Sequence, residues 1–223
     1  MKGGANSSVQ TPMMVEQAIE SARKHGISLE PGIRNKADGN CAFESVLHNI
    51  NYRDCFPIKL NKQINFYRNT WVTQLEKDVD ATVGAGYTEE EKRENWERLK
   101  HSGVYDIPFF GDLVINGIAK GCHKNILIFN TSKEAADPIY VVQANEFGGN
   151  ADSDIPVVLA YNQVHYESLH PSSIEDIEKT KILMHSYING QYHFKKSDIT
   201  FLISEYTYRE SRKEVAKKSQ RYG

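Results

Sequence analysis

The feature that most constrains the fold is an almost wholly apolar run from Pro156 to Tyr161. Its length and the turn residues after it are typical of a strand buried on both faces, and such strands lie inside a sheet. Asn162-Gln163 predicts a turn into a further strand, Val164 to Leu169. Two more strands are predicted at Lys124 to Phe129 and at Ile139 to Gln143. We therefore expect a sheet with the apolar run near its centre.

Helices are predicted where apolar residues recur at helical spacing. They cover Met13 to Lys24, Ile58 to Val79, Glu89 to Leu99 and Asp112 to Lys120, and another begins at Cys41. Thr88 and Glu91 have the spacing of a capping box. Gly121 is expected to end the helix that precedes it.

Both ends of the chain are expected to be appendages, and the first helix either packs on the core or lies at a second binding site. We expect a disordered leader at residues 1–12, an N-terminal helical extension at residues 13–30 and a C-terminal extension at residues 172–223. The last of these ends in a basic helix from Ser204 that is expected to be solvated. Its unfinished-looking end suggests a fragment of a longer polypeptide.

The composition is ordinary for a soluble globular protein, with 223 residues, 39% hydrophobic and 25% charged. A formal net charge of −2 predicts no general attraction to nucleic acid or to an anionic membrane. No apolar stretch approaches the ~18 residues of a membrane span, and the first residues lack the pattern of a secretory signal. The three cysteines are too few for a disulfide scaffold, which favours a reducing compartment.

Cys41 has the setting of a reactive thiol. A thiol attacks as a thiolate, and the positive end of a helix dipole favours that charge. Asp38, Gly39 and Asn40 predict a tight turn, in which backbone N–H groups of residues 38–41 can converge on an oxyanion. The alternative is that Asp38 or Asn40 caps the helix and Cys41 is a small buried residue. The other cysteines lack such a setting and are expected to be structural: Cys55 and Cys122.

His165 and Glu167 are predicted to lie on one face of the last strand, because residues i and i+2 of a strand point to the same side. The carboxylate can then hold one imidazole tautomer and favour the charged form of the ring. Tyr166 is expected to point the other way, into packing. Read alone, a His-x-Glu pair is usually a surface feature. The remaining histidines show no metal-ligand spacing with the cysteines, so neither zinc nor another cofactor is predicted.

Three stretches together resemble the ovarian-tumour (OTU) family of cysteine proteases: ADGNCAFESV, PFFGDLVINGIAKGCHKNILIF and VVLAYNQVHYESL. The family pattern is Asp-Gly-x-Cys with a bulky residue, then a Gly-led helix and a strand, and finally His-Tyr-x-Ser-Leu. The resemblance covers residues Ile33 to Leu169 and implies a papain-like α/β (α+β) fold, whose central, mostly antiparallel sheet is flanked by helices. It places an OTU catalytic domain at 31–171. It also implies hydrolysis of the isopeptide bond after the C-terminal glycine of ubiquitin.

Carried onto matching positions, the resemblance makes Cys41 the nucleophile and His165 the general base and acid. The third member stays open. Many relatives have Asp or Asn two residues after the histidine, where this chain has Glu167, and some use an acid just before the cysteine motif, here Asp38. Backbone amides of residues 38–41 are the implied oxyanion hole.

Ubiquitin's tail is basic and ends in two glycines, so its channel is expected to be narrow near Cys41 and acidic further out. Trp96, with Leu99, is a candidate for an apolar patch that binds ubiquitin's hydrophobic face, or for the core. The acidic candidates could equally be solvated residues; they are Asp106 and, in a glycine-containing loop at 144–155, Glu146, Asp152 and Asp154.

Three hypotheses of function follow. An active deubiquitinase is preferred; the others are a cysteine protease for another ubiquitin-like modifier and a ubiquitin-binding module without catalysis. The intact Cys41, His165 and acid argue against the last. We expect ubiquitin or polyubiquitin chains as partners and a monomer. The expected location is the cytoplasm, or a host's cytoplasm if the chain is a bacterial effector.

Overall fold

The computed structural model describes residues 7–35, 39–51, 60–78, 88–101, 114–133, 135, 137–144 and 156–188. Within them one sheet contains β1 (Leu29–Pro31), β2 (Ile126–Asn130), β3 (Ile139–Val142), β4 (Val157–Tyr161) and β5 (Tyr166–Pro171). The strand order is β1-β5-β4-β2-β3, and the pairs are antiparallel except β2 with β4. The prediction of a mostly antiparallel sheet is confirmed. The apolar run is β4, which has a hydrogen-bonded neighbour on each side.

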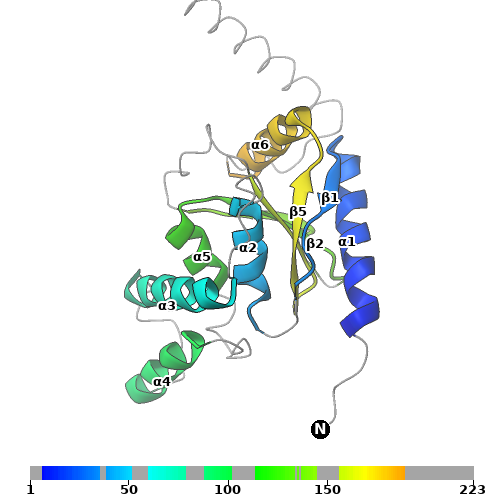
Figure 1. Ribbon diagram of the computed structural model, residues 1–223. Coiled ribbons are helices and arrows are strands. Elements are labelled where there is room, and N and C mark those ends of the chain that lie inside the picture. The colour runs from blue at the N-terminus through cyan, green and yellow to red at the C-terminus, as the bar shows by residue number, and fades with distance from the viewer. Residues whose placement is uncertain are drawn as a thin grey trace, which may run out of the picture.

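Helices cover both faces of the sheet (Figure 1). The helices are α1 (Ser7–Lys24), α2 (Cys41–Asn51), α3 (Leu60–Asp78), α4 (Glu89–Leu99), α5 (Val114–Cys122) and α6 (Ile174–Ile188). Alternate side chains of a strand point to opposite faces. Ile126 and Leu159 therefore share one core with residues of α2, α3, α4 and α5, whereas Leu127 and Val158 share a second core with residues of α1 and α6. The expected α+β class, a sheet flanked by helices, is confirmed.

The two end helices belong to this layered core: α1 packs on it, which is one of the two alternatives for the first helix, whereas α6 differs from the expectation of a C-terminal appendage. Met14 of α1 and Leu183 of α6 are buried in the core on the second face. The prediction for residues after Pro171 is wrong for α6, because this helix covers apolar side chains of the sheet that would otherwise face water. At the N-terminal end the helix already begins at Ser7, so residues 7–12 are not a disordered leader. The predicted helix from Ser204 lies outside the described residues.

Of the two predicted signals at helix ends, the capping box is confirmed and the stop at Gly121 is wrong. Thr88 and Glu91 form the predicted capping box: the Glu91 N–H donates to Oγ1 of Thr88 at 3.2 Å, and the Thr88 N–H donates to the Glu91 carboxylate at 2.7 Å. Gly121 does not end its helix, which continues one residue further. Gly121 is a packing residue instead, since a Cβ there would lie 2.0 Å from Cδ1 of Trp71 on α3. The chain turns at His123, which has φ +55°.

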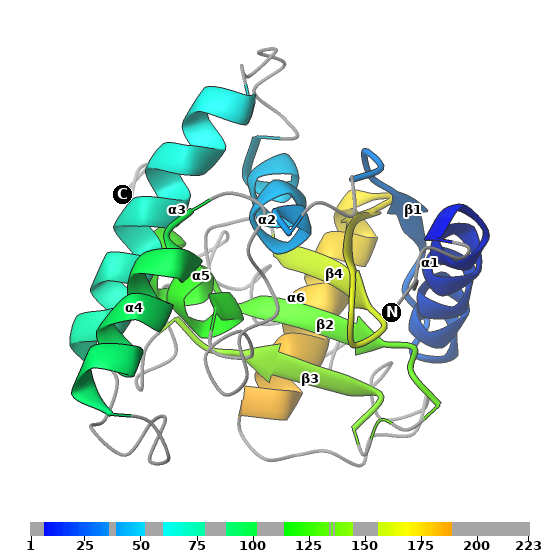
Figure 2. The same cartoon turned by 90° about the horizontal axis from the view of Figure 1, so that it is seen from below.

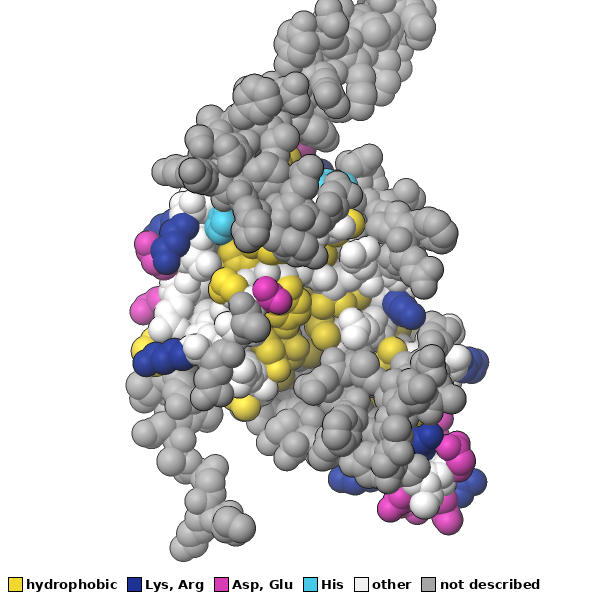
Figure 3. Space-filling model, turned by 180° about the vertical axis from the view of Figure 1, so that it is seen from behind, with side chains coloured by type: hydrophobic (Ala, Val, Ile, Leu, Met, Phe, Trp, Pro, Cys, Tyr) yellow, Lys and Arg dark blue, Asp and Glu magenta, His cyan; other side chains and the backbone are white. Residues whose placement is uncertain are grey.

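Two further views show the arrangement of the elements and one face of the surface. In Figure 2, β4, β2 and β3 follow one another across the sheet, with α3, α4 and α5 at one end and α1 at the other. Figure 3, which views the molecule from behind Figure 1, shows hydrophobic side chains gathered near the centre of that face, with most of the charged side chains towards its margin. In the described part of the chain, no helix combines the length and the apolar character needed to cross a membrane.

Candidate active site

Cys41 is the first residue of α2, as the sequence predicted. The Glu44 N–H donates to the carbonyl of Asn40 at 2.9 Å, which starts the helix immediately before the cysteine. Gly39 has φ +82°, a left-handed conformation that favours glycine and lets the chain turn sharply into the helix. The Cys41 thiol is free and the residue is 8% exposed. It therefore lies at the end of the helix where backbone N–H groups have no helical partner and the dipole favours negative charge.

His165 is placed by the turn between β4 and β5. Tyr161 pairs with Tyr166, so residues 162–165 form the turn. The side-chain oxygen of Asn162 accepts the His165 N–H at 2.9 Å and the N–H of the residue before it at 3.2 Å. The prediction that His165 lies inside the last strand is therefore wrong, because Asn162 takes the N–H groups at this end of the turn and β5 begins one residue later.

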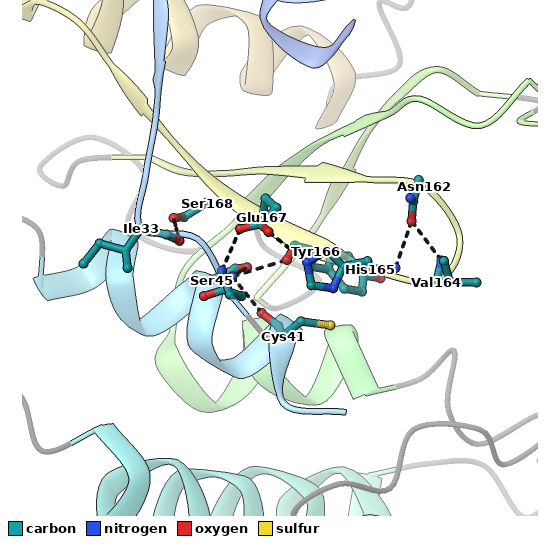
Figure 4. A network of polar contacts seen from close by, with 10 residues as sticks. Ile33, Cys41, Ser45, Asn162, Val164, His165, Tyr166, Glu167 and Ser168 are labelled. Carbon is teal, nitrogen blue, oxygen red and sulfur yellow. Dashed lines mark hydrogen bonds and ion pairs between the residues drawn. The ribbon is translucent and has the colours of Figure 1, made fainter. Parts of the chain in front are cut away.

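Glu167 contacts a near neighbour in the sequence and a distant segment through its two carboxylate oxygens (Figure 4). Oε1 lies 2.9 Å from Nε2 of His165, and Oε2 accepts the backbone N–H of Asn35 at 3.0 Å. His165 is 6% exposed and Glu167 is 2% exposed, so water competes little for this pair. Because Nε2 is held by the carboxylate, Nδ1 is the ring nitrogen left for the thiol of Cys41.

The pKa of His165 is raised to about 9. Burial of the ring lowers the pKa, but contacts with Cys41 and Glu167, together with the negative charge of both, outweigh that effect. Nδ1 has no hydrogen-bond partner of ordinary geometry. The thiol therefore acts on the ring across a long or poorly aligned contact, which is common in active sites without substrate. The favoured state of His165 at neutral pH is therefore an imidazolium.

Asn35 is a component of the site that sequence reasoning missed. Its side-chain nitrogen lies within hydrogen-bond distance of three oxygens: Oγ of Ser45, the carbonyl of Tyr166 at 3.3 Å and the carbonyl of Cys41 at 3.5 Å. Its backbone N–H also donates to Glu167. Asn35 thus ties the segment before the nucleophile to α2 and to β5. No sequence signal could have found it, since an asparagine in a loop is an ordinary turn residue.

The other predicted site residues met mixed outcomes. Gly39, Asn40 and Cys41 of the predicted oxyanion hole lie together at the start of α2. Trp96 is 7% exposed and shares the first core with Leu99, so the apolar patch proposed for these two residues is wrong and the alternative, that they belong to the core, applies. The remaining candidates lie outside the described residues and stay predictions: Asp38, Asp106, Glu146, Asp152 and Asp154. Within the described residues, no group of three or more His, Cys, Asp or Glu side chains could hold a metal ion.

Comparisons with known proteins found similarity among solved structures. A scan against models of protein families found no match, and a search of curated proteins found none. The chain is similar to the OTU domain of OTUD1, with 16% identity, a TM-score of 0.44 and coverage of 70% of this chain and 93% of that one. It is also similar to the viral OTU domain protease from Taggert virus, with 16% identity, a TM-score of 0.44 and coverage of 67% of this chain and 83% of that one.

Proposed function

We propose that this chain is a cysteine protease of the OTU type, a deubiquitinase that hydrolyses the isopeptide bond after the C-terminal glycine of ubiquitin. The arrangement of Cys41, His165 and Glu167 carries the proposal: a thiol at the start of a helix, an imidazole with a pKa raised to about 9 and a carboxylate 2.9 Å from its Nε2. These are the parts of a thiol nucleophile with an oriented base. The sequence motifs around them, which resemble the OTU pattern, indicate the substrate class.

In the first half of the proposed reaction, the thiolate of Cys41 attacks the carbonyl carbon of ubiquitin's last glycine. The carbonyl electrons move to oxygen, and backbone N–H groups at the start of α2 stabilise the resulting oxyanion. When the C–N bond breaks, the His165 imidazolium donates its proton to the departing lysine amine. The products are a free amine and a thioester between ubiquitin and Cys41, with His165 now neutral.

In the second half, neutral His165 takes a proton from water while the water oxygen attacks the thioester carbon. The tetrahedral intermediate then expels the Cys41 thiolate and leaves ubiquitin with a free carboxylic acid, which loses its proton to the solvent. The imidazolium and the thiolate are restored together, so the cycle consumes one water molecule and no cofactor. Throughout, Glu167 keeps the ring held by Nε2, so that Nδ1 makes each proton transfer.

Glu167 is therefore the proposed third member of the triad, and Asp38 is the alternative. The contact at 2.9 Å to Nε2 supports Glu167, because its longer side chain spans from the strand back to a ring located in the preceding turn. We further propose that acidic residues of the 144–155 loop, with Asp106, bind the basic tail of ubiquitin. A reducing cytoplasm, of the cell or of a host, and a monomeric state complete the proposal.

Labelling with a ubiquitin probe that carries a C-terminal electrophile tests the function. We expect the wild-type chain to form a covalent adduct and Cys41→Ala to form none, and we expect hydrolysis of at least one linkage in a panel of di-ubiquitins. Matched probes that end in other ubiquitin-like tails distinguish the modifier. If adducts form only with those probes, the substrate is another ubiquitin-like modifier and not ubiquitin. Binding of ubiquitin without any adduct or cleavage would instead favour the non-catalytic module.

A further inference from the structure

Arg68 of α3 is an arginine inside the protein, with only 1% of its surface exposed. Its Nε donates to the carbonyl of Leu99 at 2.7 Å, at the end of α4. One of its terminal nitrogens, Nη1, donates to the carbonyl of Gly39 at 2.7 Å and to the side-chain oxygen of Asn40 at 2.8 Å. Arg68, from a helix distant in sequence, thus donates hydrogen bonds to both residues that immediately precede Cys41.

These contacts control the direction of a backbone amide. The peptide between Gly39 and Asn40 is planar and trans, so its C=O and N–H point in opposite directions. When Arg68 holds the Gly39 carbonyl towards the interior, the Asn40 N–H must point away from the guanidinium. Gly39, at φ +82°, lies in a conformation from which an unrestrained glycine could readily depart. The arginine therefore removes the freedom that the glycine introduces.

An arginine suits this position better than other side chains. Its planar fork presents several N–H groups in fixed directions, so it can serve Leu99 and Gly39 at once, whereas a lysine has one nitrogen. The guanidinium carbon lies 5.1 Å from the centre of the Phe43 ring, which supports the charge from the first turn of α2. Burying an arginine is costly unless its donors are satisfied. A contact that served only packing could be made by an apolar residue.

We propose that Arg68 is a positioning residue for the oxyanion hole: it holds the Gly39–Asn40 peptide and the Asn40 side chain so that the backbone N–H groups before Cys41 remain directed at the developing oxyanion. The inference rests on the proposed thiol-protease function, of which it names a further component. Arg68 acts through the loop and does not touch the reacting atoms. Its removal should impair steps that build an oxyanion and spare thiol reactions that do not.

The test compares two reactions of Cys41 in Arg68→Met, Arg68→Lys and Asn40→Ala. Hydrolysis of ubiquitin joined at its C-terminus to aminomethylcoumarin builds an oxyanion, whereas alkylation by iodoacetamide is a displacement at carbon that builds none. We expect Arg68→Met to lower kcat roughly 100-fold with little change in KM, as loss of an oxyanion-hole donor does in other enzymes. The plateau rate of alkylation at high pH should stay near the wild-type value. Arg68→Lys should recover part of the loss.

Leu183→Ala is the matched control, because it removes a buried side chain from α6 on the opposite face of the sheet. It should lower the melting temperature without separating the two reactions. Alkylation and hydrolysis falling in parallel in the Arg68 variants would overturn the proposal, and so would a hydrolysis loss no larger than in Leu183→Ala. If Arg68→Met fails to fold, Arg68→Lys and Asn40→Ala decide on the same criterion, since each removes fewer contacts.

Acylation by p-nitrophenyl acetate separates this inference from the proposed substrate. That small ester also forms an oxyanion when a thiolate attacks it, but it requires no ubiquitin binding. If the wild-type chain cleaves no ubiquitin substrate, but Arg68→Met loses acylation and keeps alkylation, the proposed substrate is wrong and the role of Arg68 is supported. Normal ubiquitin hydrolysis in Arg68→Met would support the substrate and overturn the role of Arg68.

Discussion

Replacing Glu167 by glutamine tests the proposed triad with almost no change of shape. The carboxylate accepts two donors, Nε2–H of His165 at 2.9 Å and the backbone N–H of Asn35 at 3.0 Å. A glutamine has one oxygen and one NH₂ group, so it can accept only one of the two. If its oxygen takes the Asn35 N–H, its NH₂ donates to Nε2 and forces the ring proton onto Nδ1. The ring then carries a proton where it needs an acceptor for the thiol.

Both arrangements of the glutamine reduce activity, by amounts that can be bounded. Loss of one hydrogen bond to a charged group costs about 1.5–3 kcal/mol, which corresponds to roughly 10- to 150-fold. Fixing the wrong tautomer costs more, about 10⁴-fold when the acid of a serine triad becomes an amide. We therefore expect kcat for a fluorogenic ubiquitin substrate to fall by between about 10-fold and about 10⁴-fold. The negative charge of Glu167 helps to raise the pKa of His165 to about 9, so the basic limb of the pH–rate profile should move to lower pH.

Steady-state kinetics across pH, with melting temperatures of each variant, check this prediction. Glu76→Gln is a matched control, because Glu76 of α3 forms an ion pair at 2.9 Å with Lys100, the residue that follows α4. It should leave kcat and the pH profile unchanged. A Glu167→Gln variant that keeps kcat within about tenfold of wild type and an unmoved basic limb would refute the triad assignment. A larger loss in Asp38→Asn at unchanged melting temperature would transfer the role to that residue.

Three more predictions follow from the described contacts. Cys122→Ala should keep full labelling by a ubiquitin electrophile, and Cys41→Ala should abolish it, because burial raises the pKa of the Cys122 thiol to about 11. Intact-mass spectrometry measures the adducts, and labelling of Cys41→Ala would contradict the assignment of Cys41 as the nucleophile. Asn35→Ala should lower kcat more than it raises KM, because it loosens the segment that positions Glu167 and Cys41. Asn35→Asp is the near-isosteric comparison, and unchanged kinetics in both variants would exclude a positioning role for Asn35. Stability in urea should fall as the pH drops from 6.5 towards 4, by up to about 3 kcal/mol, because burial and a neighbouring histidine lower the pKa of His170 to about 4. A flat profile over this range would contradict the shift.

The sequence predicted those parts of the structure whose causes are local. The β4 strand is apparent from its unbroken apolar run, and the helix at Cys41 from apolar residues at helical spacing. The capping box of Thr88 and Glu91 is defined within four residues, so the contacts it predicts can form without reference to the rest of the fold. The contact between His165 and Glu167 was also predictable, because the two residues are close in sequence even though the ring lies in the turn and not in the strand.

Parts that depend on distant segments could not be predicted in this way. Asn35 and Glu167 are 132 residues apart, and Arg68 and Gly39 are 29 apart. A pattern within a helix or a loop carries no information about which side chain from elsewhere will reach it. The role of Gly121 was misread for the same reason: a glycine near a helix end is the usual stop signal, and only the position of Trp71 reveals a packing requirement.

The burial of Glu167 fits a role in the proposed chemistry better than a role in stability alone. Removing a carboxylate and an imidazole from water costs free energy, and a buried ion pair often stabilises a protein no more than apolar residues of similar volume. If packing were the only requirement at the join of β5 and the segment containing Asn35, apolar side chains would meet it as well. The ionised pair instead raises the pKa of His165, which no apolar pair can do. Because the donors to Glu167 come from two segments, the charged ring exists in this form only when the chain is folded. The proposed activation of the thiol therefore depends on the same contacts as the tertiary structure.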